Sequence, residues 1–165
     1  MLGGLALAGW SAASLMSAAP LHAQTPPFSC PRGRVIVTGT FGTAAFTVDI
    51  AADEASRAQG LMFVEQMPMS TGMLFVYPQP QRLSFWMRNT LIELDMLFVD
   101  AAGVIRHIHH RAQPLDETPI SGGDLPLLGV LEINGGLARG LGIAVGDVLT
   151  HPAFGDRDPP WVCAG

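Results

Sequence analysis

The sequence predicts a mainly β protein of the α+β class, built as a small closed or partly closed β-barrel of seven to eight short strands with two short helices. Two observations support this fold class. Short runs of apolar and β-branched residues recur along the chain and are separated by Gly- and Pro-rich turns. Only two short stretches carry the signals of a helix start and a helix stop. Many short strands, mostly joined as hairpins, favour a sheet that closes on itself.

The first half of the chain predicts a hairpin followed by a short helix. Residues 35–37 and 46–50 are β-like runs joined by a stretch rich in Gly and Thr. Asp53 is a good N-cap for a helix over residues 54–59. Gly60 is well placed as the C-terminal cap of the same helix, because glycine adopts the backbone conformation that ends a helix without strain.

The second half predicts more strands and one more helix. Residues 82–88 alternate apolar and polar side chains, with Trp86 and Arg88 on one face. Asn134 is expected to cap a short helix over residues 135–141. The other expected strands cover residues 72–77, 93–99, 104–110, 127–133 and 148–150, and residues 111–126 are expected to form a long loop.

The N-terminal residues 1–23 have the composition of a secretory signal peptide. No Asp, Glu, Lys or Arg occurs between Met1 and Leu21, and the run is rich in Leu and Ala. A cut is expected after Ala23. The alternative is an uncleaved N-terminal anchor, although glycines in the short apolar run disfavour a spanning helix. We therefore expect an exported protein, periplasmic or secreted.

The rest of the chain is long enough for one domain. We expect a linker or arm over residues 24–34, a single β-rich domain over 35–151 and a Pro- and Asp-rich tail over 152–165. The formal net charge is −5, and no basic run is present, so nucleic acid is not an expected partner. No segment after the signal peptide is long and apolar enough to predict insertion into a membrane.

Two cysteines lie near the two ends of the expected mature chain. In an oxidising compartment Cys30 and Cys163 could form one disulfide that ties the termini together. The alternative is a pair of unrelated thiols in the two tails. Because the chain is expected to be exported, we favour the disulfide.

Six short motifs, among them Gly60-Leu61-Met62 and Phe85-Trp86-Met87-Arg88-Asn89-Thr90, together resemble the domain of unknown function 192 family of small prokaryotic proteins. The most specific is the segment Phe85-Trp86-Met87-Arg88-Asn89-Thr90 followed by Leu94-Asp95, and the resemblance spans residues 46–151. Arg88 stands where Lys is usual in the family, which keeps the charge. The resemblance implies a compact β-rich fold, often behind a signal peptide, and it implies no settled activity. The other motifs are Gly60-Leu61-Met62, Gly72-Met73-Leu74-Phe75, Phe98-Val99-Asp100, Gly103-Val104-Ile105 and Leu131-Glu132-Ile133-Asn134-Gly135-Gly136.

The segment over residues 85–90, which we call the tryptophan motif, predicts a polar cluster inside apolar sequence. Apolar residues flank Asp95 on both faces of its strand, and a buried carboxylate is unfavourable unless hydrogen bonds satisfy it. If residues 82–88 and 93–99 form a hairpin, Trp86 and Arg88 could donate to Asp95. The cluster is then either a structural network or a pocket for an anion or a sugar-like ligand. The candidate ligand-binding residues are Trp86, Arg88, Asn89, Thr90, Asp95, Glu132 and Asn134.

Two alternative functions remain open at this stage. Asp95 and Glu132 are both carboxylates in apolar contexts, so they form a candidate acid/base pair for a hydrolase. A metal site for copper or zinc would use soft or imidazole ligands, namely Met67, Met69, His107 and His109. The leading interpretation is a non-catalytic binding or accessory module without a cofactor. Its partner would be a small molecule or an envelope protein, which the sequence does not name.

Overall fold

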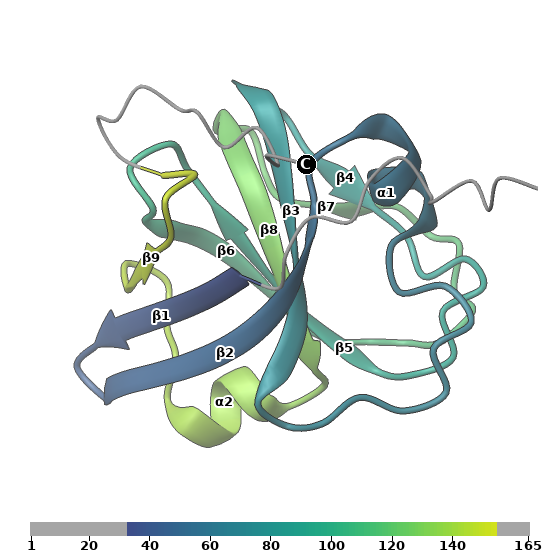
Figure 1. Ribbon diagram of the computed structural model, residues 1–165, viewed down its shortest axis with the longest axis horizontal. Coiled ribbons are helices and arrows are strands. Elements are labelled where there is room, and N and C mark those ends of the chain that lie inside the picture. Colours follow the sequence, from purple (N-terminus) through teal and green to yellow (C-terminus); the bar gives the residue numbers. More distant parts are fainter. Residues whose placement is uncertain (1–32, 155–165) are drawn as a thin grey trace, which may run out of the picture.

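The structure, a computed structural model, describes residues 33–154 and confirms a mainly β fold (Figure 1). A sheet of seven strands curls into a half-barrel, and a separate sheet of two short strands lies beside it. The order in the large sheet is β6-β5-β8-β3-β2-β1-β9. The elements are β1 (Gly33–Gly39), β2 (Gly42–Ala51), α1 (Glu54–Gln59), β3 (Thr71–Gln81), β4 (Ser84–Phe85), β5 (Leu94–Val99), β6 (Ile105–Ala112), β7 (Ile120–Ser121), β8 (Leu127–Asn134), α2 (Leu137–Leu141) and β9 (Val148–Thr150).

The large sheet comes close to closing on itself where its first and last strands meet. An isolated bridge joins Val104, just before β6, to Val148 in β9. The Ile105 N–H also donates to the Asp147 carbonyl, at 2.9 Å. Gly103 adopts a φ of +85° in the turn before this contact, a conformation that glycine reaches without strain. The expected partly closed barrel is thus present, with a seam between β6 and β9.

Both faces of the sheet are buried, so the protein has two apolar cores. The inner core fills the inside of the curled sheet and includes Leu97, Val99, Leu131 and Ile133. The outer core lies on the opposite face, and its buried side chains include Phe75, Leu83, Met87, Leu94, Met96, Phe98, Leu127 and Val130. Because side chains alternate along a strand, neighbouring residues of β5 and β8 enter different cores.

Helix α1 begins and ends at the caps that the sequence predicts. The Asp53 carboxylate accepts from the Ser56 N–H at 2.9 Å, and the Ser56 side chain bonds back to the Asp53 backbone, which completes a capping box. At the other end the Gly60 N–H donates to the Ser56 carbonyl. The cap fixes where the helix starts on the outer face of the sheet.

One predicted pairing is wrong. Strand β4, which leads into the tryptophan motif, does not form a hairpin with β5. It pairs instead with β7, with Ser84 opposite Ser121 and Phe85 opposite Ile120. Strand β7 lies within the expected long loop, whose polar sequence gave no strand signal. Strand β5 pairs with β6 and β8.

Three sequence expectations lie outside the described residues. They are the signal peptide over residues 1–23, most of the linker over residues 24–34, and the disulfide between Cys30 and Cys163. At the other end, part of the expected tail belongs to the fold, because Ala153 and Phe154 are buried in the inner core.

Candidate functional site

Asp95 is buried, and its carboxylate is held by the backbone. It is fully excluded from solvent on the inner face of the sheet. Oδ1 accepts from the N–H groups of Arg111 and Gly136 at 2.8 and 2.9 Å, and Oδ2 accepts from the Ala138 N–H at 2.8 Å. Three backbone donors compensate a buried carboxylate for the water it has lost. Asp95 therefore ties the end of β6 to the start of α2.

The expected donors to Asp95 were the wrong ones. The Trp86 side chain lies away from Asp95, and the residue is 48% exposed. The guanidinium of Arg88 lies 5.5 Å from the centre of the Trp86 ring and 4.0 Å from the Glu117 carboxylate. The burial of Asp95 was predicted correctly, but its partners come from β6 and α2. Sequence reasoning missed them because backbone N–H groups carry no residue signature.

Glu132 is the second buried carboxylate, and its surroundings differ. It is only 4% exposed and lies on the outer face of β8, opposite Met73 of β3 and Met96 of β5. Within residues 33–154, no hydrogen bond or ion pair engages its carboxyl group. Burial raises the pKa of Glu132 to about 8. The side chain therefore carries a proton at neutral pH, and the described part of the chain supplies no acceptor for it.

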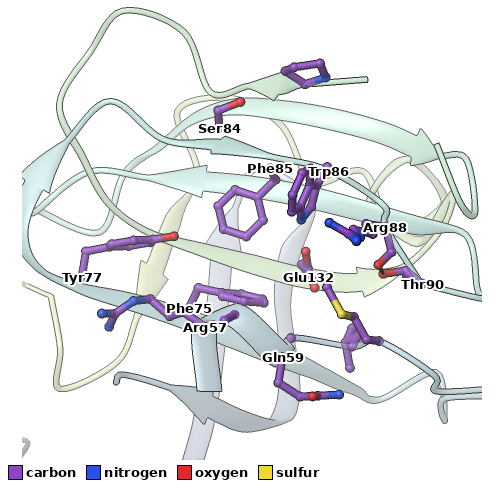
Figure 2. Close-up of a pocket in the computed structure, with 15 residues that line it drawn as sticks. Arg57, Gln59, Phe75, Tyr77, Ser84, Phe85, Trp86, Arg88, Thr90 and Glu132 are labelled. Carbon is purple, nitrogen blue, oxygen red and sulfur yellow. Dashed lines mark hydrogen bonds between the residues drawn. The ribbon is translucent and has the colours of Figure 1, made fainter. Parts of the chain in front are cut away.

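The Glu132 carboxyl group faces a cavity of about 330 Å³, which we call the Glu132 pocket (Figure 2). Its size is in the range of small-molecule sites. In Figure 2 the carboxyl group lies among the aromatic side chains of the cavity, with Arg88 and Thr90 on one side. The pocket is lined by residues 57–62 at the end of α1, by Phe75 and Tyr77 of β3, by Ser84, Phe85, Trp86, Arg88 and Thr90 in and after β4, and by Pro119 and Glu132.

The aromatic rings form a packed wall. The rings of Phe75 and Phe85 meet edge to face with centres 5.0 Å apart, and Phe85 meets Phe98 in the same way at 5.9 Å. Trp86 remains half exposed, so one part of its ring is available to a ligand. Aromatic walls that carry a small number of polar groups are typical of sites that orient a small molecule.

Two arginines lie at the edge of the pocket, and they are engaged differently. The Arg57 guanidinium donates to the carbonyls of Ala52 and Val76 and lies 5.0 Å from the centre of the Tyr77 ring. Burial raises the pKa of Tyr77, and the positive charge of Arg57 offsets part of this increase. Within residues 33–154, the partners of Arg88 are the stacked Trp86 ring and the Glu117 carboxylate at 4.0 Å. Arg57 is thus a fixed part of the wall, whereas Arg88 is held weakly.

Asn89 and Thr90 help to bring the loops around the pocket together. Asn89 adopts a φ of +54°, and its carbonyl accepts from the N–H of Phe63, which has a φ of +65°. The Thr90 carbonyl accepts from the N–H of Leu115, at a φ of +64°. Such conformations are unfavourable for bulky residues and persist where the surroundings impose them. Thr90 lines the pocket, whereas Asn89 does not line it and connects its loop to Phe63 through a backbone hydrogen bond.

The proposed acid/base pair is not assembled. Asp95 lies opposite Ile133, and Met96 lies opposite Glu132, in the register of β5 with β8. A shift of one residue places side chains on opposite faces of a sheet. Asp95 therefore points into the inner core, while Glu132 faces the pocket on the outer side. The two carboxylates cannot act on one substrate, which corrects the hydrolase hypothesis.

Asn134 is a structural residue in a role that was not predicted. The N-cap of α2 is Gly136, with a φ of +81°, and no side chain caps the helix. The Asn134 amide donates to the carbonyls of Met67 and Pro68, at 3.1 and 3.2 Å. It thereby fixes the loop before β3, and it does not line the Glu132 pocket.

The candidate metal ligands do not converge. Across residues 33–154, no group of three His, Cys, Asp or Glu side chains is placed to hold a metal ion. His107 and His109 lie on β6, where the His107 ring is 5.6 Å from that of Phe98. Burial, followed by the neighbouring His109 and His110, lowers the pKa of His107. Met67 is partly buried in the outer core, and Met69 is exposed.

Several residues of the pocket were missed from the sequence. Arg57 lies on a short helix and reads as a solvated charge, while Phe75 and Tyr77 read as ordinary residues of a buried strand. Four of the predicted ligand-binding residues do line the pocket, namely Trp86, Arg88, Thr90 and Glu132. The rest of the wall was missed, because it comes from segments far apart in the chain.

Comparisons with known proteins find related chains of similar fold. The family model DUF192, described as "Uncharacterized ACR", matches residues 35–151. A crystal structure of a protein of unknown function from Novosphingobium aromaticivorans is 44% identical, covers 72% of this chain and 84% of its own, and has a TM-score of 0.70. No curated protein matches the chain.

A second crystal structure, from Sinorhizobium meliloti, extends the same comparison. It is 38% identical, covers 78% of this chain and 100% of its own, and has a TM-score of 0.74. That protein is provisionally named a transcription regulator. The similarity in sequence and in fold thus spans most of the described domain.

Proposed function

We propose that this protein, which belongs to the DUF192 family, is a non-catalytic module that binds a small molecule in the Glu132 pocket. The observation that carries the proposal is the buried carboxyl group of Glu132, which faces a cavity without a hydrogen-bond partner in the described chain. A buried polar group without a partner is unfavourable, so a ligand that satisfies it gains affinity. The partly exposed Trp86 ring offers such a ligand an apolar surface.

The lining of the pocket favours binding over catalysis. Glu132 is its only carboxylate, and no His, Cys or Lys is among the described residues that line it. General acid/base hydrolysis of a glycoside needs two carboxyl groups that face one cleft. Ser84 and Thr90 have no base beside them in the lining. The pocket therefore supplies recognition without the groups for bond cleavage.

The proposal is tested by blocking the pocket from the exposed side of α1. Ala58 and Ala55 are both exposed on this helix, but only Ala58 lines the pocket. Ligands found by NMR in a library of small fragments should lose binding to the Ala58→Trp variant. They should still bind the Ala55→Trp variant, which is the matched control. Fragments that bind both variants equally, or no fragment that binds the wild type, would overturn the proposal.

The name of the Sinorhizobium relative is not extended to this chain. Binding to DNA depends on a surface of Lys and Arg that neutralises phosphates. This chain has a formal net charge of −5 and no lysine. A ligand-binding role agrees with the pocket and does not require nucleic acid.

Export remains a proposal based on the sequence. The apolar N-terminal run supports secretion, and a disulfide between Cys30 and Cys163 would form in an oxidising compartment. No helix among the described residues is long and apolar enough to cross a membrane. Mass spectrometry of the protein from the bacterial envelope should show an N-terminus at Gln24 and one disulfide. An intact Met1 would contradict cleavage, and two free thiols would contradict the disulfide.

A further inference from the structure

The charges around the Glu132 pocket limit which ligand it can accept. The neutral carboxyl group of Glu132 offers one O–H donor, for which the described residues supply no acceptor. Among the described residues that line the pocket, the other charged side chains are Arg57 and Arg88. With Glu132 protonated, the lining carries a positive charge, and both Glu132 and Arg88 can donate hydrogen bonds to a ligand.

Of the two arginines, Arg88 is the one whose guanidinium is available to bind a ligand. Arg57 is fixed by two backbone carbonyls, whereas Arg88 lies 4.0 Å from the exposed Glu117. Figure 2 shows Arg88 and Glu132 pointing into the same space beside the Trp86 ring. Both side chains line the same cavity, and no ion pair between them is found in the described part of the chain, so one ligand group can contact both. A guanidinium fork matches a planar group with two acceptor oxygens.

We infer that the pocket takes a small organic carboxylate whose two oxygens bridge the Glu132 carboxyl group and the Arg88 guanidinium, with its apolar body against Trp86 and Phe85. The inference rests on the proposed function and names the chemical class of the ligand. A cationic ligand would be repelled by the two guanidinium groups of the lining, and a neutral one would leave the charge of Arg88 without a counter-charge. A carboxylate satisfies both partners at once.

This arrangement predicts a dependence of affinity on pH. The titratable and charged groups that line the pocket with Glu132 are Tyr77 from β3, Arg57 from α1 and Arg88 after β4. Burial raises the pKa of Tyr77 above its ordinary value of 10.0, so Glu132, with a pKa of about 8, is the group that titrates in this range. Once Glu132 ionises, it loses its donor and repels a second carboxylate. Affinity should therefore be highest below pH 8 and fall above it.

The experiment is a calorimetric titration of the full chain with benzoate, benzamide and benzylammonium, which share one ring and differ in charge. Benzoate should bind best at pH 6, and its affinity should fall about tenfold by pH 9, as the protonated fraction of Glu132 falls. The Glu132→Gln variant keeps an N–H donor but cannot ionise, so its affinity for benzoate should be the same at both pH values. A fall of equal size in this variant would overturn the inference.

Arg88 is tested against a matched surface arginine. Arg88→Gln should weaken benzoate by about tenfold, as expected for a lost charge-assisted contact, and leave benzamide unchanged. Arg82→Gln is the control, because Arg82 is exposed, pairs with Asp124 and does not line the pocket. Equal effects of the two substitutions would overturn the role of Arg88.

The outcomes separate this inference from the proposed function. Preferred binding of benzamide or benzylammonium, if blocked by Ala58→Trp, would overturn the carboxylate class and support the pocket. Benzoate that still binds Ala58→Trp would lie elsewhere and overturn the bridge between Glu132 and Arg88. If none of the three probes binds at millimolar concentration, the carboxylate class is overturned, and the fragment library then tests the pocket by itself.

Discussion

Two buried carboxylates on neighbouring strands of this protein have opposite roles. Asp95 on β5 receives three backbone N–H groups, from Arg111, Gly136 and Ala138. Glu132 on β8 receives none from the described chain and faces a cavity. Both residues are less than 5% exposed, so burial alone does not distinguish them. The number of hydrogen bonds does.

The difference shows how a structural polar group can be separated from a binding group. A carboxylate with three donors is already satisfied and has nothing to offer a ligand. A carboxyl group that the fold leaves without a partner keeps its proton and lowers stability, and natural proteins accept such losses mainly at functional sites. Asp95 therefore belongs to the architecture, and Glu132 to the proposed site.

The largest expected effect comes from Asp95→Asn. The new amide nitrogen would replace one acceptor, so at least one of the three buried N–H groups would lose its partner. Lost charge-assisted hydrogen bonds and an unpaired buried donor should lower the free energy of unfolding by about 3 kcal/mol. Urea denaturation at pH 7 measures this loss.

The control for Asp95→Asn is Asp124→Asn, because Asp124 is exposed and its pair with Arg82 lies at the surface. The control should change the free energy of unfolding by less than about 0.5 kcal/mol. An Asp95→Asn variant as stable as this control would refute the structural role of Asp95.

Glu132→Gln should have a smaller effect of the opposite sign at alkaline pH. The folded-state pKa of Glu132 is about 8, above its ordinary value of 4.5. The folded state thus binds this proton more tightly than the unfolded state. The stability contribution is fully present below pH 4.5 and is lost as the pH rises through 8. Glutamine has no proton to lose, so at pH 8 the variant should be more stable than the wild type by about 2 kcal/mol, because the cost of an unpaired buried amide offsets part of the gain.

Unfolding in urea between pH 5 and pH 9 measures this difference. The stabilisation by Glu132→Gln should increase with pH across the interval. Glu65→Gln is the matched control, since Glu65 is exposed, and it should give no such trend. A difference between Glu132→Gln and the wild type that stays constant with pH would show that Glu132 is not a buried, protonated acid.

The smallest expected effect is that of Asp53→Ala, which removes a carboxylate at the protein surface. A hydrogen bond from the Ser56 side chain, and then one from its backbone, lower the pKa of Asp53. Its contribution is thus present above its ordinary pKa of 3.8 and is lost as the pH falls. Asp53→Ala should lower the melting temperature modestly at pH 7, as loss of an N-cap costs about 1 kcal/mol.

The Asp53→Ser variant keeps a capping acceptor and should recover most of the stability. Because α1 forms one wall of the Glu132 pocket, Asp53→Ala should also weaken ligand binding more than Asp53→Ser does. Equal melting temperatures for Asp53→Ala and the wild type would show that the cap does not stabilise α1.

The residue pattern alone was enough to predict the fold class, most strands, the cap at Asp53 and the burial of Asp95. These features are local, since they depend on the alternation of side chains and on backbone preferences within a few residues. Glu132 was also marked from the sequence by its apolar neighbours. The resemblance to the family, carried by the tryptophan motif, is likewise a property of the sequence.

The tertiary structure decided which groups meet. The short strand β4 pairs with β7 rather than with β5. Trp86 and Arg88, which follow β4, therefore line the Glu132 pocket and do not contact Asp95. The register of β5 with β8 then separated Asp95 from Glu132 onto opposite faces. Strand pairing and register join segments distant in sequence through backbone hydrogen bonds that every residue type can form. The sequence pattern therefore identified a carboxyl group worth attention, and only the fold determined whether it had partners.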